Sequence, residues 1–209
     1  MARTLLKVPR FDKSKNNMGD ATPPVLMAAD FWADVAPCEH LLQIYTDENV
    51  LMDSLEGFVA GGILAGDAVI VIATAQHREE LAKRLRNCGL DPDAAQSDGT
   101  YLPLDAEQTL AQFMVGGWPN DDLFNRLIAQ LLHPARVQGR RVRAFGEMVA
   151  LMWANGQKGA TVRLEYLWHQ LCEEEGFSLL CAYPKKGFHR DALSSLHDIF
   201  AAHSKVIPG

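Results

Sequence analysis

The feature that most constrains the fold is the run AVIVIAT at 68–74, which is apolar at every position but the last. It does not alternate between apolar and polar residues, as a strand with one face in water does. Strands of this kind are covered on both faces, which is typical of parallel sheets with helices on each side. The run therefore predicts an inner strand of an α/β fold.

Further segments predict more strands, at 40–46, 100–105, 141–146 and 177–183. The segments between them have helical periodicity, clearest over 121–132 and 161–175. Strands that alternate with helices indicate a mainly parallel sheet with right-handed crossovers. We therefore predict one three-layer α/β domain over 25–209, with helices on both faces and the centre of its mostly parallel sheet in 40–46, 68–74 and 141–146.

The polar, irregular residues 1–24 predict a flexible N-terminal leader, followed by a short amphipathic helix within 25–37. No apolar stretch is long enough for a signal peptide core or a membrane span, so we expect a cytoplasmic protein. The net charge of -6 disfavours direct binding to nucleic acid or to a membrane, because both require a basic surface. A homo-oligomer is compatible with the sequence.

Recognisable catalytic and metal motifs are missing. The four cysteines form no CxxC pair and predict free thiols, and the seven histidines show no zinc spacing. Cys38-Glu39-His40 is too short to define a site. There is neither a GxSxG elbow nor a GxxxxGK[ST] phosphate loop. We therefore predict no catalytic residue, no metal site and no enzyme activity, and the sequence identifies no cofactor.

Polar side chains gather where the predicted strands end. Because parallel strands end at one edge, and open α/β sheets bind their ligands there, these residues are candidates for a ligand site. The strand-end candidates are Tyr45, Asp47, Thr74, His77, Asp105, Glu147 and Tyr183. Such a set suits a small polar or cationic ligand, or a divalent metal held by oxygen ligands. Glu165 and Trp168, on the last long helix, complete the candidate set.

Several candidates also have a purely structural interpretation. Asp47 and Asp105 each precede a helix and could be N-caps. Glu147 follows a glycine and enters an apolar helix, so its charge requires a ligand or an ion pair with Arg143 or Arg163. Glu165 could pair in the same way with Arg163 or Lys158.

Longer motifs carry a family resemblance. They are Pro37-Cys38-Glu39-His40, the run from Gly66 to Thr74, His77-Arg78, Leu104-Asp105-Ala106, Phe113-Met114, the run from Arg143 to Val149, Arg163-Leu164-Glu165-x-x-Trp168, and the run from Leu180 to Pro184. Over roughly 37–207 the chain resembles the MEDS domain, the methanogen/methylotroph sensory domain. His169 departs from the family pattern, in which asparagine is commoner after the tryptophan.

The resemblance implies a signal-input module of the kind found beside histidine kinases and DNA-binding regulators. It also implies distant kinship with RecA/KaiC-type ATPase domains, in which 45–54 would take the position of the phosphate loop. That segment has no glycine and no lysine, so the nucleotide chemistry would be lost.

These observations favour a non-catalytic sensory module that binds a small molecule at the strand ends and regulates a histidine kinase or transcription regulator in trans. Two alternatives stay open. One is a divergent enzyme, or a residual nucleotide-binding protein, that uses Glu147, Asp105 and His77. The other is an interaction module with an empty cleft.

Overall fold

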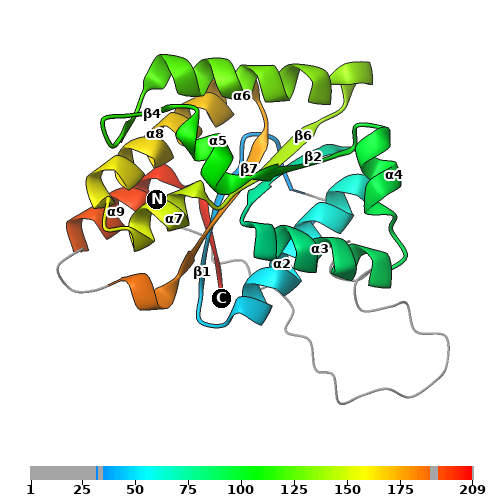
Figure 1. Ribbon diagram of the computed structural model, residues 1–209, viewed down its shortest axis with the longest axis horizontal. Helices are drawn as coiled ribbons and strands as arrows, with labels where there is room; N and C mark the ends of the chain where they lie inside the picture. Colours follow the sequence, from blue (N-terminus) through cyan, green and yellow to red (C-terminus); the bar gives the residue numbers. More distant parts are fainter. Residues whose placement is uncertain (1–31, 33–34, 189–192, 209) are drawn as a thin grey trace.

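The computed structural model describes residues 32, 35–188 and 193–208. Within this part, one sheet has the strand order β3-β2-β6-β7-β1-β8, and every neighbouring pair in it is parallel (Figure 1). Its strands are β1 (His40–Tyr45), β2 (Ala68–Ala73), β3 (Tyr101–Asp105), β6 (Val142–Gly146), β7 (Ser178–Pro184) and β8 (Lys205–Pro208). The predicted three-layer α/β architecture is confirmed.

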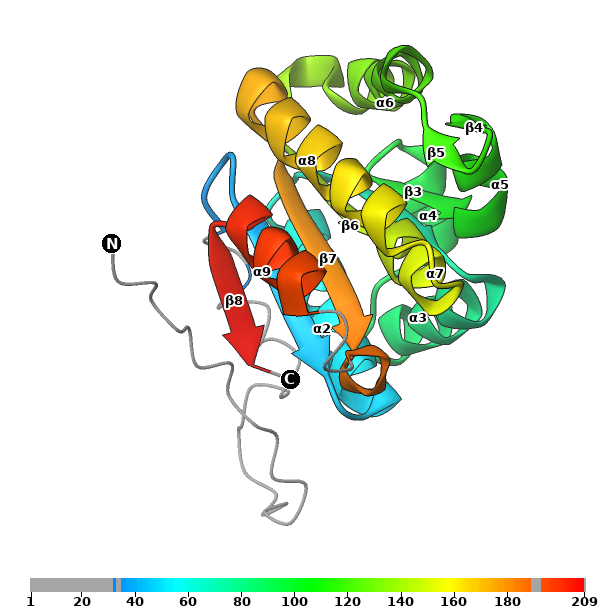
Figure 2. The same cartoon turned by 90° about the vertical axis from the view of Figure 1, so that its left-hand side faces the viewer.

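Helices cover both faces of this sheet. One face carries α2 (Glu48–Leu64), α3 (Ala75–Asn87) and α4 (Pro92–Ser97). The other carries α5 (Ala106–Ala111), α6 (Asp121–Ala135), α7 (Met148–Ala154), α8 (Lys158–Glu175) and α9 (Leu193–Ala202). Figure 2 shows α6 to α9 on the face of the sheet turned to the viewer, with α2 behind it.

Strand β2 explains why the core has two halves. Successive side chains of a strand point to opposite faces, so Val69 and Val71 pack with α2 and α3, while Ile70 and Ile72 pack with α6 to α8. All residues of β2 are buried, as the uninterrupted apolar run predicts.

Capping residues in the sequence mark where the helices begin and end. The side chain of Asn120 accepts a hydrogen bond from the Leu123 N–H and caps α6. Helix α8 ends at Gly176, which has the left-handed conformation (φ 67°) that lets its N–H donate to the Cys172 carbonyl.

The predicted strands are confirmed to within a residue or two at each end, but the predicted centre of the sheet is only partly right. Strand β7 lies between β6 and β1, so β6 and β7 form the middle. The sequence reasoning also missed β8 and a small antiparallel hairpin of β4 (Met114–Val115) and β5 (Trp118–Pro119). These strands are too short to show a period.

The predicted leader, 1–24, lies outside the described residues, as does most of the helix predicted within 25–37. Trp32 is described: it is helical and buried, and its ring packs edge-on against Phe58 at 5.5 Å between centroids. Over the described ranges, no helix is both long enough and apolar enough to cross a membrane.

Candidate functional site

Glu147 joins the ends of two neighbouring strands. It follows β6 directly, and its backbone N–H donates to the Ile72 carbonyl of β2 at 2.9 Å. Its side chain turns back to the same strand, where Oε2 accepts a hydrogen bond from the Thr74 N–H at 2.8 Å. The carboxylate therefore lies at the carboxyl edge of the sheet, as predicted, and is 7% exposed.

Among the described residues no arginine contacts Glu147, so the ion pairs predicted with Arg143 and Arg163 are wrong. Arg143 instead contacts Asp67, with Nε 2.6 Å from Oδ2, and Arg163 contacts Asp121. The side chain of Arg143 points from β6 toward α2, away from the edge of the sheet where Glu147 lies. The sequence alone does not show which acidic residue each arginine contacts.

His77 supplies the missing partner, from the first turn of α3. Its Nδ1 is 2.8 Å from Glu147 Oε1, and its Nε2 is 3.1 Å from Glu48 Oε2. The hydrogen bond to Glu147 raises the pKa of His77 above its ordinary value, against the opposing effect of burial. The two carboxylates therefore stabilise the protonated form of His77 relative to a free imidazole.

Tyr45, at the end of β1, completes this group. It is buried, and burial together with the carboxylates of Glu48 and Glu147 raises the pKa of its phenol, which therefore stays neutral. We call Tyr45, Glu48, Thr74, His77 and Glu147 the strand-edge cluster. Glu48 was not among the predicted residues, although its position after Asp47 at the start of a helix placed it at this edge.

Two aspartates were predicted to lie at this edge of the sheet, and each of them caps a helix. Asp47 accepts from the Asn49 N–H at 2.8 Å at the start of α2. Asp105 accepts from the Gln108 N–H at 3.0 Å at the start of α5, and also from Arg78 at 2.8 Å. The capping interpretation is confirmed for both, and Asp105 is engaged away from His77.

The side chains of Tyr183, Glu165 and Trp168 lie apart from the strand-edge cluster, although Tyr183 is near the carboxyl end of β7, as predicted. Tyr183 is fully buried on the face of the sheet opposite to Tyr45, and it donates a hydrogen bond to Glu165 Oε1. Trp168 packs in the core, edge-on to Phe124 at 4.9 Å. The ion pairs suggested for Glu165 are wrong too, since Arg163 contacts Asp121 and Lys158 lies over a tryptophan ring.

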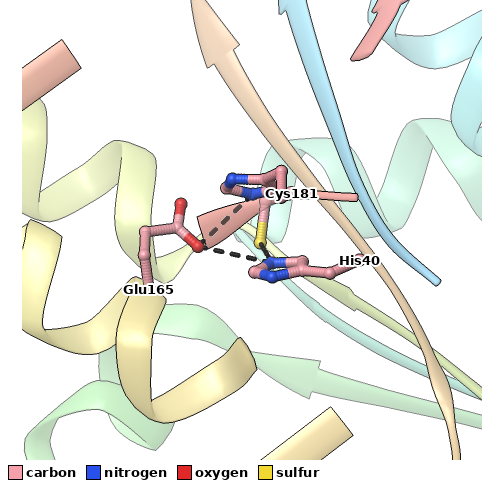
Figure 3. Close-up of side chains that lie close together, drawn as sticks. His40, Glu165 and Cys181 are labelled. Carbon is pink, nitrogen blue, oxygen red and sulfur yellow. Dashed lines mark hydrogen bonds and ion pairs between the residues drawn. The ribbon is translucent and has the colours of Figure 1, made fainter. Parts of the chain in front are cut away.

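Glu165 belongs to a second group of polar side chains inside the protein. His40 of β1, Glu165 of α8 and Cys181 of β7 point toward one another between the sheet and the helix layer (Figure 3). His203, which follows α9, is the fourth member. One nitrogen, oxygen or sulfur atom of each lies within 4.8 Å of all the others, and none of the four residues is more than 4% exposed. We call these four residues the buried quartet.

Three of the distances inside the buried quartet are closely similar. His40 Nε2 is 3.4 Å from Cys181 Sγ and 3.4 Å from Glu165 Oε2. His203 Nε2 is 3.5 Å from the same Glu165 oxygen. Nitrogen, oxygen and sulfur atoms of four side chains thus lie close together inside the protein.

Backbone carbonyls fix the orientation of both imidazoles. His40 Nδ1 is 2.9 Å from the Ala202 carbonyl oxygen, and His203 Nδ1 is 2.6 Å from that of Ile199. A carbonyl can only accept, so Nδ1 carries the hydrogen in each ring and Nε2 presents a lone pair. Burial lowers the pKa of His40 to about 3 and that of His203 to about 4, so both rings are neutral at physiological pH.

The sequence gives little sign of the buried quartet, because its members lie at 40, 165, 181 and 203 and no two have the spacing of a metal motif. A separate hollow of about 480 Å³ lies at the opposite edge of the sheet, between the ends of α6 and α8. Its lining includes Leu132, Arg136 and Glu175, and it brings no candidate residue together.

Comparison with known proteins places the chain in a family. Residues 39–204 match the family model described as MEDS, the MEthanogen/methylotroph, DcmR Sensory domain. No curated protein matches the chain. Because the match covers well over half of the chain, the protein belongs to the MEDS family, and the predicted family is confirmed.

Proposed function

We propose that this MEDS domain is a non-catalytic signal-input module that binds a small polar molecule at the strand-edge cluster. The change between the ligand-free and ligand-bound domain would then be passed to a signalling protein such as a histidine kinase or a transcription regulator. The sensory character of the family supports the signalling role. The observation that carries the ligand site is the His77 imidazole, held between Glu147 and Glu48 where open α/β sheets bind their ligands.

The charges of the cluster define the ligand class. Two carboxylates face one imidazole, so the group has an excess negative charge whether or not His77 is protonated, and the neutral Tyr45 phenol lies beside them. The side chain of Glu48 is 55% exposed, so a ligand in solution can reach it. A small molecule with a cationic or hydrogen-bond-donating group fits this surface, whereas an anion would be repelled.

The same contacts offer a route for the signal. Glu48 begins α2, His77 lies in the first turn of α3, and Glu147 immediately precedes α7. Helices α2 and α3 cover one face of the sheet and α7 the other. A ligand that takes the place of His77 at Glu48 would change the balance of contacts among three helix starts, and so would bias their packing.

The charges also speak against phosphate as the ligand. Asp47 lies in the turn between β1 and α2, Glu48 begins α2, and the Glu147 carboxylate lies nearby. A phosphate cradle needs convergent N–H groups and a cation, so ATP would meet repulsion here. The alternative of an enzyme using Glu147, Asp105 and His77 together loses support, because Asp105 is held by Arg78 and by the α5 cap.

A thermal-shift series tests the proposal with short primary amines, alcohols and carboxylates as probes. We expect amines or alcohols to raise the melting temperature of the wild type and the carboxylates to have no effect. Glu48→Gln should abolish the response, and the exposed Glu107→Gln should keep it. Equal responses of the two variants, or a response to carboxylates alone, would contradict a ligand site at the strand-edge cluster.

A further inference from the structure

We propose that His40, Glu165, Cys181 and His203 form a closed binding site for a divalent transition metal ion of the zinc class. Four potential ligand atoms converge on one point: two imidazole Nε2 atoms, one carboxylate oxygen and one sulfur. This site is separate from the strand-edge cluster and does not depend on the function proposed for it.

The spacing of the atoms matches a metal centre better than a set of hydrogen bonds. Zinc holds nitrogen and oxygen ligands at about 2.0–2.2 Å and sulfur at about 2.3 Å, so neighbouring ligands of a tetrahedral site are about 3.3–3.6 Å apart. The observed distances of 3.4 Å and 3.5 Å from Glu165 Oε2 to the two imidazoles fall in that range. A proton shared between a carboxyl oxygen and an imidazole would draw the two atoms to roughly 2.7–2.9 Å.

The hydrogen-bond inventory leads to the same conclusion. The carbonyls of Ala202 and Ile199 take the Nδ1 hydrogens, so both Nε2 atoms present lone pairs toward the centre of the quartet, where the Cys181 thiol contacts only that of His40. Glu165 Oε2 and His203 Nε2 are buried and have no hydrogen-bond partner in the described structure. Buried acceptors that face one another are costly, and a cation at their centre satisfies all of them at once.

The surroundings of the four ligands are those of a metal site. Histidine ligands of metals usually donate their second N–H to a carbonyl or carboxylate, as His40 and His203 do here. The remaining oxygen of Glu165 accepts a hydrogen bond from Tyr183, which fixes the carboxylate so that Oε2 alone faces the centre.

Charge and donor type define the metal. A divalent ion with one thiolate, one carboxylate and two neutral imidazoles has no net charge, which suits a fully buried position. Two nitrogens, one sulfur and one oxygen suit zinc, whereas magnesium and calcium require oxygen ligands. When the ion binds, the thiol proton of Cys181 leaves to solvent, together with any proton on Glu165.

Because four protein ligands fill a tetrahedral zinc site, this site has no open position and is structural rather than catalytic. It joins β1, α8 and β7 to the turn after α9, where the Ser204 N–H also donates to the His40 carbonyl at 2.8 Å. The ion would therefore fasten the C-terminal α9–β8 segment to the sheet (Figure 2).

Metal binding by the full chain tests the inference. Protein freed of metal by a chelator is titrated with Zn²⁺ and, separately, with Co²⁺, which reports ligand type by its absorption. We expect about one equivalent of either metal per chain and, with Co²⁺, the thiolate-to-metal charge-transfer band of a tetrahedral site. A chain that takes up less than about a tenth of an equivalent, or a Co²⁺ complex without a thiolate band, would overturn the proposal.

Matched variants assign the ligands. Cys181→Ala should abolish the thiolate band, whereas Cys172→Ala, which also removes a buried thiol, should keep it. If Cys181→Ala does not fold, His203→Gln is compared with the exposed His197→Gln, and only the former should lose the metal. Retention of the full wild-type spectrum by Cys181→Ala or His203→Gln would refute the assignment.

Discussion

The contact between Glu147 and His77 allows a stability prediction with a defined magnitude. Glu147→Gln preserves the side-chain shape and an acceptor oxygen for the Thr74 N–H, but it places a neutral amide against His77. The two side chains are only 9% and 11% exposed, so water screens their contact weakly. A hydrogen bond to a charged group contributes about 1.5–3 kcal/mol, and we expect Glu147→Gln to lower the free energy of unfolding by that amount at about pH 6.

The pH dependence follows from the raised pKa of His77. A group whose pKa is higher in the folded state than its ordinary 6.5 contributes stability that is fully present below 6.5. That contribution is lost as the pH rises through the folded-state pKa.

A double-mutant cycle in urea measures this contact alone. Wild type, Glu147→Gln, His77→Gln and the double variant are unfolded at about pH 6 and at about pH 9, with the exposed Glu107→Gln as a control. We expect the coupling energy to fall by at least about 1 kcal/mol between the two conditions. A coupling energy that is equal at both pH values would refute the assignment of a charged His77, and a coupling near zero at about pH 6 would refute the contact itself.

Further predictions concern the buried charge pair, a helix–sheet contact, the buried quartet and nucleotide binding. Asp67→Asn removes the carboxylate from Arg143, which is 1% exposed, and should lower the free energy of unfolding by about 3–5 kcal/mol in urea titrations. Gly62→Ala would place a Cβ 2.6 Å from a side-chain atom of β2 and should cost about 1–3 kcal/mol in the same assay, because α2 must move away from the sheet. Tyr183→Phe removes the hydrogen bond to Glu165 and should weaken Zn²⁺ binding by about 10- to 100-fold in competition with a chelator. Calorimetry should detect no binding of ATP with magnesium, since the β1–α2 turn presents acidic side chains, and micromolar binding would restore the nucleotide-binding alternative.

The strands of the sheet can be predicted from the sequence, because a strand that is buried on both faces consists of apolar residues. The run at 68–74 is apolar throughout since both faces of β2 are covered, and Gly176 marks the end of α8 because its backbone is left-handed. The order of the strands leaves no such mark. The residues of β7 do not show which strands it pairs with. Its place between β6 and β1 is set by the packing of the whole chain.

The two candidate sites also differ in how far the sequence predicts them. Glu147 and His77 were predictable as neighbours, because each follows a parallel strand and such strand ends meet at one edge. The buried quartet has no comparable rule, because its members lie within β1, β7 and α8 and after α9, and no pattern in the sequence joins them. Glu165 gave the one usable signal: it is a carboxylate on an apolar helix face, beside Trp168. A fully buried carboxylate requires compensation, and in the described structure no lysine or arginine contacts Glu165, whose pKa is raised by burial. Tyrosine, histidine, cysteine, a bound proton or the proposed metal ion is left to supply that compensation.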